Sequence, residues 1–174
     1  MLRTTNSLPS QAILDGSKKL VFIIAMLLTV DSSFAIPGSI TAPDSFITSL
    51  GAMNNLIRAS FRKDFKKAEL MGYEASRQYT KLIFRMNDMV LFAFYSDNGE
   101  LLAVTRNIRS NQLPISLLLE LKKDYNDYWI SDLFELYGEG QNSYYITIEN
   151  ADKKITLRSG NNTSWELYER RNKK

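Results

Sequence analysis

One order of elements, a helix followed by three strands, occurs twice along this chain and constrains its fold more than any other feature. In the first occurrence, Ile57, Phe61 and Phe65 recur at i, i+4 and i+8, which is the spacing of one helix face. This apolar stripe predicts an amphipathic helix over 53–68. Three runs rich in aromatic and β-branched residues then predict strands at 79–86, 89–96 and 101–108.

The second occurrence begins at Leu113-Pro114, because proline fits the first turn of a helix, where its missing N–H leaves no hydrogen bond unmade. Ser110 or Asn111 is expected to cap this helix. Further apolar runs predict strands at 129–137, 143–149 and 154–158, and a short last strand at 165–168.

Short matches between the two halves indicate an internal duplication. The matching pieces are Lys63-Asp64-Phe65 with Lys123-Asp124-Tyr125, at an offset of 60 residues, and Phe92-x-Phe94 with Ile146-x-Ile148, at an offset of 54. We therefore predict an α+β fold made of two αβββ units, 53–109 and 110–170, with a frayed tail at 171–174. Their strands would form one antiparallel sheet with both helices packed on one face.

The segment before this domain has the three parts of a secretory signal peptide. Lys18 and Lys19 supply positive charge, an uncharged run of 11 residues follows at 20–30, and Ser33-Phe34-Ala35 places small residues before a cleavage site. The apolar run is shorter than the about 20 residues that a membrane-spanning helix needs. A buried core helix and an uncleaved membrane anchor are the alternatives.

Cleavage after Ala35 would make 1–35 a signal peptide and 36–52 a leader that precedes the folded domain. Pro37, Gly38 and Pro43 in this leader disfavour regular structure. We expect the mature protein to be periplasmic or secreted and to keep no stable membrane span.

Two residue types are absent, and their absence excludes most catalytic chemistry. The 174 residues contain no His and no Cys. Histidine-activated nucleophiles, thiolate chemistry, disulfides and cysteine or histidine metal sites are therefore excluded. An enzyme built only on carboxylates, on Ser and Lys, or on Tyr stays open, but no constellation in the sequence indicates one. We therefore expect no enzyme activity, no cofactor and no metal. The formal net charge of +3 is too small to indicate nucleic acid as a partner.

Specific positions in both halves resemble the PepSY-like family, which is also described as β-lactamase-inhibitor-like. In the second half these are Leu113-Pro114, Leu117, Leu121, Tyr125, Tyr128, Ile130, the Tyr144-Tyr145 strand and the strand at 154–157. In the first half they are Phe61-x-x-x-Phe65 and Ser96-Asp97-Asn98-Gly99. The resemblance spans 53–158 and implies a tandem αβββ fold, export from a Bacteroidetes-type bacterium, and a binding or inhibitory role without catalysis.

The chain departs from that family in three ways. Its ending has Arg158-Ser159-Gly160 where the family leads us to expect an Asp-x-x-Gly turn. Secreted β-lactamase inhibitor proteins of this architecture carry disulfides, whereas this chain has no Cys. No inhibitory loop matches residue by residue, so inhibition of a β-lactamase is not carried over.

Aromatic residues are dense in the second half and supply the candidate partner-binding side chains. Tyr144 and Tyr145 are adjacent, so one of them must point outward if this run is a strand. Exposed tyrosine and tryptophan are good anchors for a protein partner, and we expect Tyr137 or Trp165 to lie beside that outward tyrosine. Burial of most of these side chains in the core is the alternative.

Two further groups of polar residues are candidate contacts. Asp97 and Asn98 precede Gly99 in a predicted hairpin, which would either enter a partner's cleft or form only a tight turn. The first helix carries a basic face that would contact an anionic surface or be solvated. Its members are Arg58, Arg62, Lys63, Lys66 and Lys67.

Together these features predict an exported, non-enzymatic domain that binds or inhibits another protein of the cell envelope, such as a peptidase or a cell-wall enzyme. The alternative is an envelope-surface or ligand-sensing module that contacts anionic lipid or glycan through the basic face.

Overall fold

The structure of the chain, a computed structural model, describes residues 53–173. The predicted signal peptide and leader therefore lie outside the described residues. The elements are the helices α2 (Asn55–Asp64) and α3 (Ile115–Asp124), a short 3₁₀ helix η2 (Ser110–Gln112), and the strands β1 (Glu69–Ala75), β2 (Thr80–Met86), β3 (Met89–Tyr95), β4 (Leu101–Asn107), β5 (Trp129–Gly138), β6 (Gln141–Glu149), β7 (Lys153–Ser159) and β8 (Glu166–Asn172).

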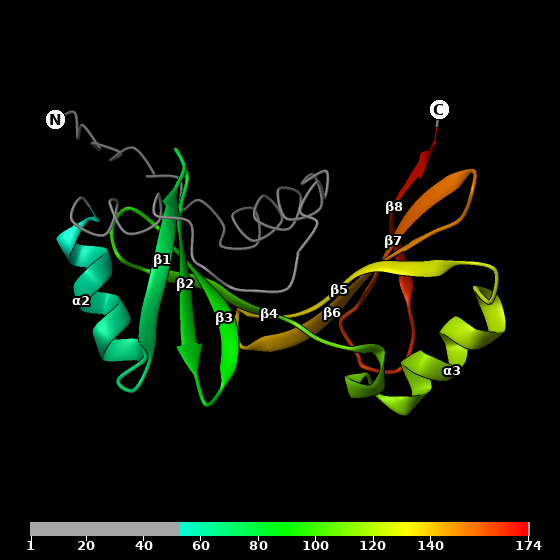
Figure 1. Cartoon of the computed structure of the whole chain (residues 1–174), viewed down its shortest axis with the longest axis horizontal. Coiled ribbons are helices and arrows are strands. Elements are labelled where there is room, and N and C mark those ends of the chain that lie inside the picture. Colours follow the sequence, from blue (N-terminus) through cyan, green and yellow to red (C-terminus); the bar gives the residue numbers. More distant parts are fainter. Residues whose placement is uncertain (1–52, 174) are drawn as a thin grey trace, which may run out of the picture. The chain divides into compact units, whose positions relative to one another are not determined.

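All eight strands form one sheet in the order β1 to β8, and each strand pairs antiparallel with the next (Figure 1). The predicted α+β class, with an antiparallel sheet and two helices, is confirmed. The tightest hairpins, β2–β3 and β5–β6, have two residues between their strands. At Asn87-Asp88, for example, both residues adopt positive φ, as asparagine and aspartate tolerate.

The structure adds one strand to the predicted order, so that four strands follow each helix. The additional strand is β1, which the sequence pattern missed because Gly72 resembles a break. Gly72 instead follows a β-bulge, where the pairing with β2 shifts register between Leu70 and Gly72. The helices begin 60 residues apart (Asn55 and Ile115), and so do the strands that follow them (Glu69 and Trp129). The match at an offset of 54 residues, in contrast, relates β3 to β6. Because β3 is the third strand after α2 and β6 is the second strand after α3, these two strands are not equivalent.

Each helix covers its own part of the sheet and forms a separate core. The N-terminal core joins α2 to β2 and β3, and consists of Met53, Ile57, Phe61, Leu82, Phe84, Leu91, Ala93 and Tyr95. The C-terminal core joins α3 to β5, β6 and β7, and consists of Ile108, Leu113, Leu117, Leu121, Leu133, Ile146, Ile148, Ile155, Leu157 and Trp165.

Strand register places both cores on the same face of the sheet, as predicted. Ala93 of the N-terminal core pairs with Val104 of β4, and Val104 pairs with Tyr137 of β5. Alternate residues of a strand point to the same face, so Tyr137 shares its face with Leu133 of the C-terminal core. Both helices therefore pack on one side, here called the helix side.

The helix ends differ from the predicted ones. The α2 helix ends at Asp64 rather than at Ala68, and its C-cap Phe65 donates its backbone N–H to the carbonyl of Phe61. Ser110 and Asn111 do not cap α3; they form η2, and Pro114 occupies the N-cap position without a side-chain hydrogen bond. Because η2 places a turn between β4 and α3, the helix begins at Ile115.

The β3–β4 hairpin packs closely against α2. The side chain of Asn54, which also caps α2 through Leu56 N, donates from Nδ2 to the carbonyl of Asp97 at 3.0 Å. Gly99 follows with a φ of +76°. A Cβ atom at Gly99 would lie 2.9 Å from Ser60 Oγ and 3.2 Å from the backbone of Leu56. This hairpin therefore needs glycine for both its conformation and its approach to the helix.

None of the helices within residues 53–173 is long and apolar enough to cross a membrane.

Replacing Gly99 with alanine tests the contact between the hairpin and α2. Both Gly99 and Gly140 have positive φ, +76° and +75°, but nothing lies within 4 Å of a Cβ at Gly140. Gly140→Ala is thus a matched control for the conformational cost, which is about 1 kcal/mol. We expect Gly99→Ala to lower the free energy of unfolding in urea by about 1 kcal/mol more than the control. Equal losses in the two variants would contradict the close packing of the hairpin on α2.

Candidate partner-binding surface

On the helix side of the sheet, side chains between the two cores are covered by neither α2 nor α3. Arg106 of β4 pairs with Glu135 of β5, and Glu135 pairs with Tyr144 of β6, so these side chains share the helix side with Tyr137. Arg106, Glu135 and Tyr137 belong to neither core, and Tyr144 packs against the edge of the C-terminal core. We call Arg106, Glu135, Tyr137 and Tyr144 the mid-sheet patch.

The polar side chains of this patch, Arg106, Glu135 and Tyr144, interact with one another. Arg106 Nε donates to Glu135 Oε2 at 2.6 Å, and Arg106 Nη1 lies 3.3 Å from Met89 Sδ. Burial raises the pKa of the Tyr144 hydroxyl, and the negative charge of Glu135 beside it raises that pKa further. Tyr137, in contrast, is 52% exposed. The patch therefore presents a free aromatic ring next to a preformed ion pair.

Of the two adjacent tyrosines, Tyr145 is the buried one, and of the alternatives Tyr137 and Trp165, Trp165 is buried. Tyr145 is 1% exposed, because its ring stacks on Phe134 at 5.2 Å and meets the edge of Tyr168 at 5.6 Å on the side of the sheet opposite the helices. Burial raises its pKa to about 12. Tyr144 is partly buried, so neither of the two tyrosines is fully exposed. Tyr144 is the one that lies on the same face of the sheet as Tyr137.

Trp165 is buried because its indole completes a hydrogen bond to α3. Nε1 donates to the carbonyl of Leu117 at 3.0 Å, and the backbone N–H of Trp165 donates to Glu120 Oε2 at 3.1 Å. At 8% exposure, Trp165 is part of the C-terminal core. It locks the segment before β8 onto the helix and leaves little area for a partner.

Asp97 and Asn98 are exposed at the tip of the β3–β4 hairpin. Their position is fixed by the contact between Asn54 and the carbonyl of Asp97. The hairpin tip lies against the first turns of α2, and it is separate from the mid-sheet patch. The predicted partner-binding residues that are at least partly exposed therefore fall into two regions, Tyr137 with Tyr144 and Asp97 with Asn98.

The predicted basic face is divided between a helix and a loop. Arg58 is partly buried on α2, and Arg62 and Lys63 are exposed in its last turn, where positive charge stabilises the helix dipole. Lys66 and Lys67 are exposed in the turn after the helix has ended. Four exposed cations thus lie within six residues, although they do not share one helical face.

A cluster at the C-terminus was not predicted, because 171–174 was expected to be frayed. Arg171 and Asn172 belong to β8, and the side chain of Lys173 contacts both a carboxylate and an aromatic ring. Its Nζ lies 2.7 Å from Glu149 Oε2 and 4.6 Å from the centroid of the Trp129 ring. Lys154 Nζ approaches the other oxygen of Glu149 at 3.4 Å. These residues, Trp129, Glu149, Lys154 and Lys173, are called the Glu149 cluster.

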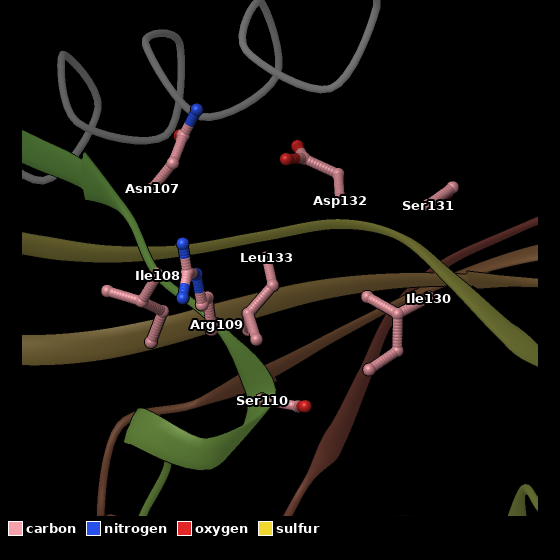
Figure 2. A pocket seen from close by; sticks show the side chains of 8 residues that line it. All are labelled: Asn107, Ile108, Arg109, Ser110, Ile130, Ser131, Asp132 and Leu133. Carbon is pink, nitrogen blue, oxygen red and sulfur yellow. The ribbon is translucent and has the colours of Figure 1, made fainter.

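A cleft opens where β4 and β5 separate (Figure 2). The pairing of the two strands ends at Asn107 and Phe134, and β5 carries a bulge between Ile130 and Asp132. The cleft has a volume of about 400 Å³. Its lining residues are Asn107, Ile108, Arg109, Ser110, Ile130, Ser131, Asp132 and Leu133.

Within residues 53–173, no three Asp or Glu side chains lie close enough together to hold a metal ion. The described surfaces offer an aromatic ring beside an ion pair, a group of exposed cations, and a cleft with charged and apolar lining residues.

Comparisons with known proteins show a likeness of fold. No family model matches the sequence, and no curated protein matches it. A DUF2874 family protein from Bacteroides uniformis has a similar structure, with a TM-score of 0.61, 13% identity, and coverage of 69% of this chain and 89% of that chain. A BLIP-like protein from Bacteroides fragilis matches with a TM-score of 0.58, 18% identity, and coverage of 67% and 84%.

A third similar structure is that of a candidate periplasmic protein from Bacteroides eggerthii, with a TM-score of 0.59, 12% identity, and coverage of 68% of this chain and 87% of that chain. At these identities the comparisons establish the fold alone. The chain therefore has a BLIP-like fold. This confirms the β-lactamase-inhibitor-like architecture that the sequence resemblance implied.

The Glu149 cluster predicts a pH dependence of stability. The hydrogen bond from Lys173, with smaller contributions from Ser131 and Lys154, outweighs the effect of burial and lowers the pKa of Glu149 from 4.5 to about 2. A carboxyl group with a lowered pKa in the folded state contributes stability above its unfolded pKa, and this contribution is lost as the pH falls from 4.5 towards 2. We expect Glu149→Gln to be less stable than wild type at pH 7, and the difference to shrink across that interval.

Urea unfolding at a series of pH values measures this difference. Glu139→Gln, at an exposed turn residue, is the control and should leave the free energy of unfolding nearly unchanged at each pH. A gap between wild type and Glu149→Gln that stays constant from neutral pH down to the acid limit would refute the role of the ionised carboxylate.

Proposed function

We propose that this chain is an exported, non-enzymatic binding domain of the PepSY-like kind that holds another protein of the cell envelope against its mid-sheet patch. The observation that carries the proposal is the half-exposed ring of Tyr137 beside the Arg106–Glu135 ion pair, in the gap between the two cores. Because the chain needs none of these side chains for its cores, their arrangement is available for a partner.

The residue types of the patch suit a protein interface. Tyrosine and arginine are enriched among the residues that dominate binding energy, because each buries a large surface and also offers a hydrogen bond. Arg106 is already oriented by Glu135, at 2.6 Å, so little conformational freedom would be lost on binding. The partner would supply an apolar pocket for Tyr137 and hydrogen-bonding groups for the ion pair.

Export is supported by the order of positive charge, apolar run and small residues in 18–35. The fold agrees with this proposal, since a candidate periplasmic protein and a BLIP-like protein share it. A peptidase or a cell-wall enzyme of the envelope is the class of partner that fits an inhibitory or sequestering domain.

Replacing Tyr137 with alanine tests this surface. Wild-type protein, immobilised and exposed to envelope extract of the source organism, should retain one stoichiometric protein, whose affinity is then measured with purified components. Truncating a central tyrosine costs about 2 kcal/mol or more, so Tyr137→Ala should bind that partner about 30-fold more weakly. Tyr137→Phe should retain most of the affinity, because the ring is kept.

Leu167→Ala is the matched control, since Leu167 is 57% exposed on the edge strand β8. It should bind like wild type. Equal affinity of wild type and Tyr137→Ala for the retained protein would eliminate the mid-sheet patch as the binding surface. Hydrolytic activity of the purified protein on its own would contradict the non-enzymatic part of the proposal.

A second function is favoured by the basic residues near the end of α2. Arg62, Lys63, Lys66 and Lys67 are all exposed, and none forms an ion pair with another described residue. Such a group would attract the anionic headgroups of a membrane surface or an anionic glycan.

Binding to vesicles that contain an anionic phospholipid tests the second function. Each cation near a charged membrane contributes about 1 kcal/mol, so the triple variant Arg62→Gln, Lys63→Gln, Lys66→Gln should bind about 100-fold more weakly. The control neutralises three other exposed lysines, Lys122, Lys123 and Lys153. Binding that is insensitive to salt, or an equal loss in the control, would count against a specific basic surface.

A further inference from the structure

The β3–β4 hairpin contains the only Asn-Gly pair of the sequence, Asn98-Gly99. The side-chain amide of an asparagine is open to attack by the backbone nitrogen of the next residue, and glycine hinders this attack least because it has no Cβ. Asn98 is exposed at the hairpin tip, and within residues 53–173 its carboxamide forms no hydrogen bond. The carbon atom that would be attacked is therefore accessible and free to reorient.

Other asparagines at turns have side chains that are held in place. The Oδ1 atom of Asn150 accepts the backbone N–H of Lys153 at 2.8 Å, and Oδ1 of Asn161 accepts that of Thr163 at 3.0 Å. These hydrogen bonds fix the carboxamide and leave it engaged with a residue further along the chain. The structure thus distinguishes Asn98 by its freedom as well as by the glycine that follows it.

The turn itself limits the reaction. The backbone N–H of Gly99 donates to the carbonyl of Ser96 at 2.9 Å, and the N–H of Ser96 donates to the carbonyl of Glu100 at 2.9 Å. The nitrogen of Gly99 attacks only after base has removed its proton, and a hydrogen-bonded N–H is reached by base only when the bond opens. The reaction therefore requires a local opening of the hairpin.

Contacts with α2 hold this hairpin closed. Nδ2 of Asn54 donates to the carbonyl of Asp97 at 3.0 Å. Gly99 approaches the helix so closely that a Cβ atom there would lie 2.9 Å from Ser60 Oγ. Because opening the turn displaces Gly99 and its neighbours, it has to loosen these contacts as well.

We propose that Asn98 is a site of spontaneous deamidation, and that the contact between the hairpin and α2 sets its rate. The deprotonated nitrogen of Gly99 forms a bond with Cγ of Asn98. The bond from Cγ to the amide nitrogen breaks, and this nitrogen takes up a proton and leaves as ammonia. Water then opens the resulting succinimide ring at either carbonyl, which gives aspartate or isoaspartate. This modification goes beyond the proposed function and does not depend on it.

The products would change the hairpin in two ways. Both add a negative charge beside Asp97, and isoaspartate also lengthens the backbone by one carbon atom before Gly99. A longer loop cannot keep both the hydrogen bond to Ser96 and the close approach to Ser60. Chains that carry isoaspartate should therefore lose part of the contact between the hairpin and α2.

Peptide mapping of the aged protein tests the site. The full chain is purified, incubated in mildly alkaline buffer and digested with trypsin, and tandem mass spectrometry then locates the conversion of amide to acid in the fragment 86–106. This fragment also contains Asn87, which is exposed but is followed by Asp88, and it is the internal control. We expect conversion at Asn98 and none at Asn87. The chain unfolded in urea should react about tenfold faster at Asn98, since the turn is then open.

Two variants test the role of α2. Asn54→Ser keeps a residue that caps the helix but is too short to reach the carbonyl of Asp97, so Asn98 should be converted about fivefold faster. Ser76→Ala is the matched control, because it removes a hydrogen bond of 2.9 Å to the carbonyl of Tyr79 in a different hairpin, β1–β2. It should leave the conversion of Asn98 at the wild-type rate.

The stability of the modified protein tests the consequence. The modified chain carries one additional negative charge, so ion exchange separates it from the unmodified chain. In urea, the isoaspartate form should unfold at a lower concentration than the variant Asn98→Asp, which has the same charge without the longer backbone.

Three results would overturn the proposal. Folded protein that shows no conversion at Asn98, after the sample in urea has been converted, would show that the native chain is not modified there. Equal rates in the folded and unfolded chain would remove the role of the turn. Equal acceleration by Asn54→Ser and Ser76→Ala would show that global unfolding, and not the contact with α2, sets the rate.

Discussion

The pairing of β4 with β5 is the constraint on which the remaining features depend. Among the described residues, only four strand pairs, Val104 to Asn107 with Tyr137 to Phe134, join the sheet's first four strands to its last four. Each half has its own helix and its own core, so this short ladder alone makes them one continuous sheet. Its register puts both helices on one side, and its early end leaves room for the cleft.

The same ladder explains why the mid-sheet patch is polar and partly exposed. A strand between two cores needs apolar residues only where a helix covers it, and α2 and α3 lie over β2–β3 and β5–β7. At the junction, the sequence instead places Arg106 opposite Glu135. An ion pair across neighbouring strands stabilises the register there without requiring a helix above it. The structural role and the proposed binding role of these residues are therefore compatible.

Local patterns predicted most of the fold, and long-range contacts account for what they missed. The spacing of Ile57 and Phe61 located α2, and the runs of β-branched residues located seven of the strands. The missing strand, β1, contains Gly72 at a bulge, and a bulge is defined by the partner strand rather than by the sequence around it. The early end of α2 at Asp64 likewise has no local signal, since Phe65 and Ala68 continue the apolar stripe.

The candidate site was predictable only in part, for the same reason. Tyr137 was among the predicted residues, but its neighbours Arg106 and Glu135 are brought together by strand pairing across 29 residues. The sequence left Tyr137 and Trp165 as alternatives beside the outward tyrosine, and it could not exclude Trp165, because the indole donates to a carbonyl of α3 that lies 48 residues earlier. Lys173 was expected in a frayed tail, because nothing nearby in the sequence shows that Glu149 and Trp129 would hold it.

The order of the sheet also bears on how the chain folds. Every one of the seven strand pairings joins sequence neighbours, so no strand waits for a distant segment before it can pair. Low sequence separation between contacting residues favours fast folding. The first helix and its four strands can bury the N-terminal core before the rest has emerged. A chain that folds in this order leaves few apolar strands unpaired at any stage, because each new strand finds its partner in the one just formed.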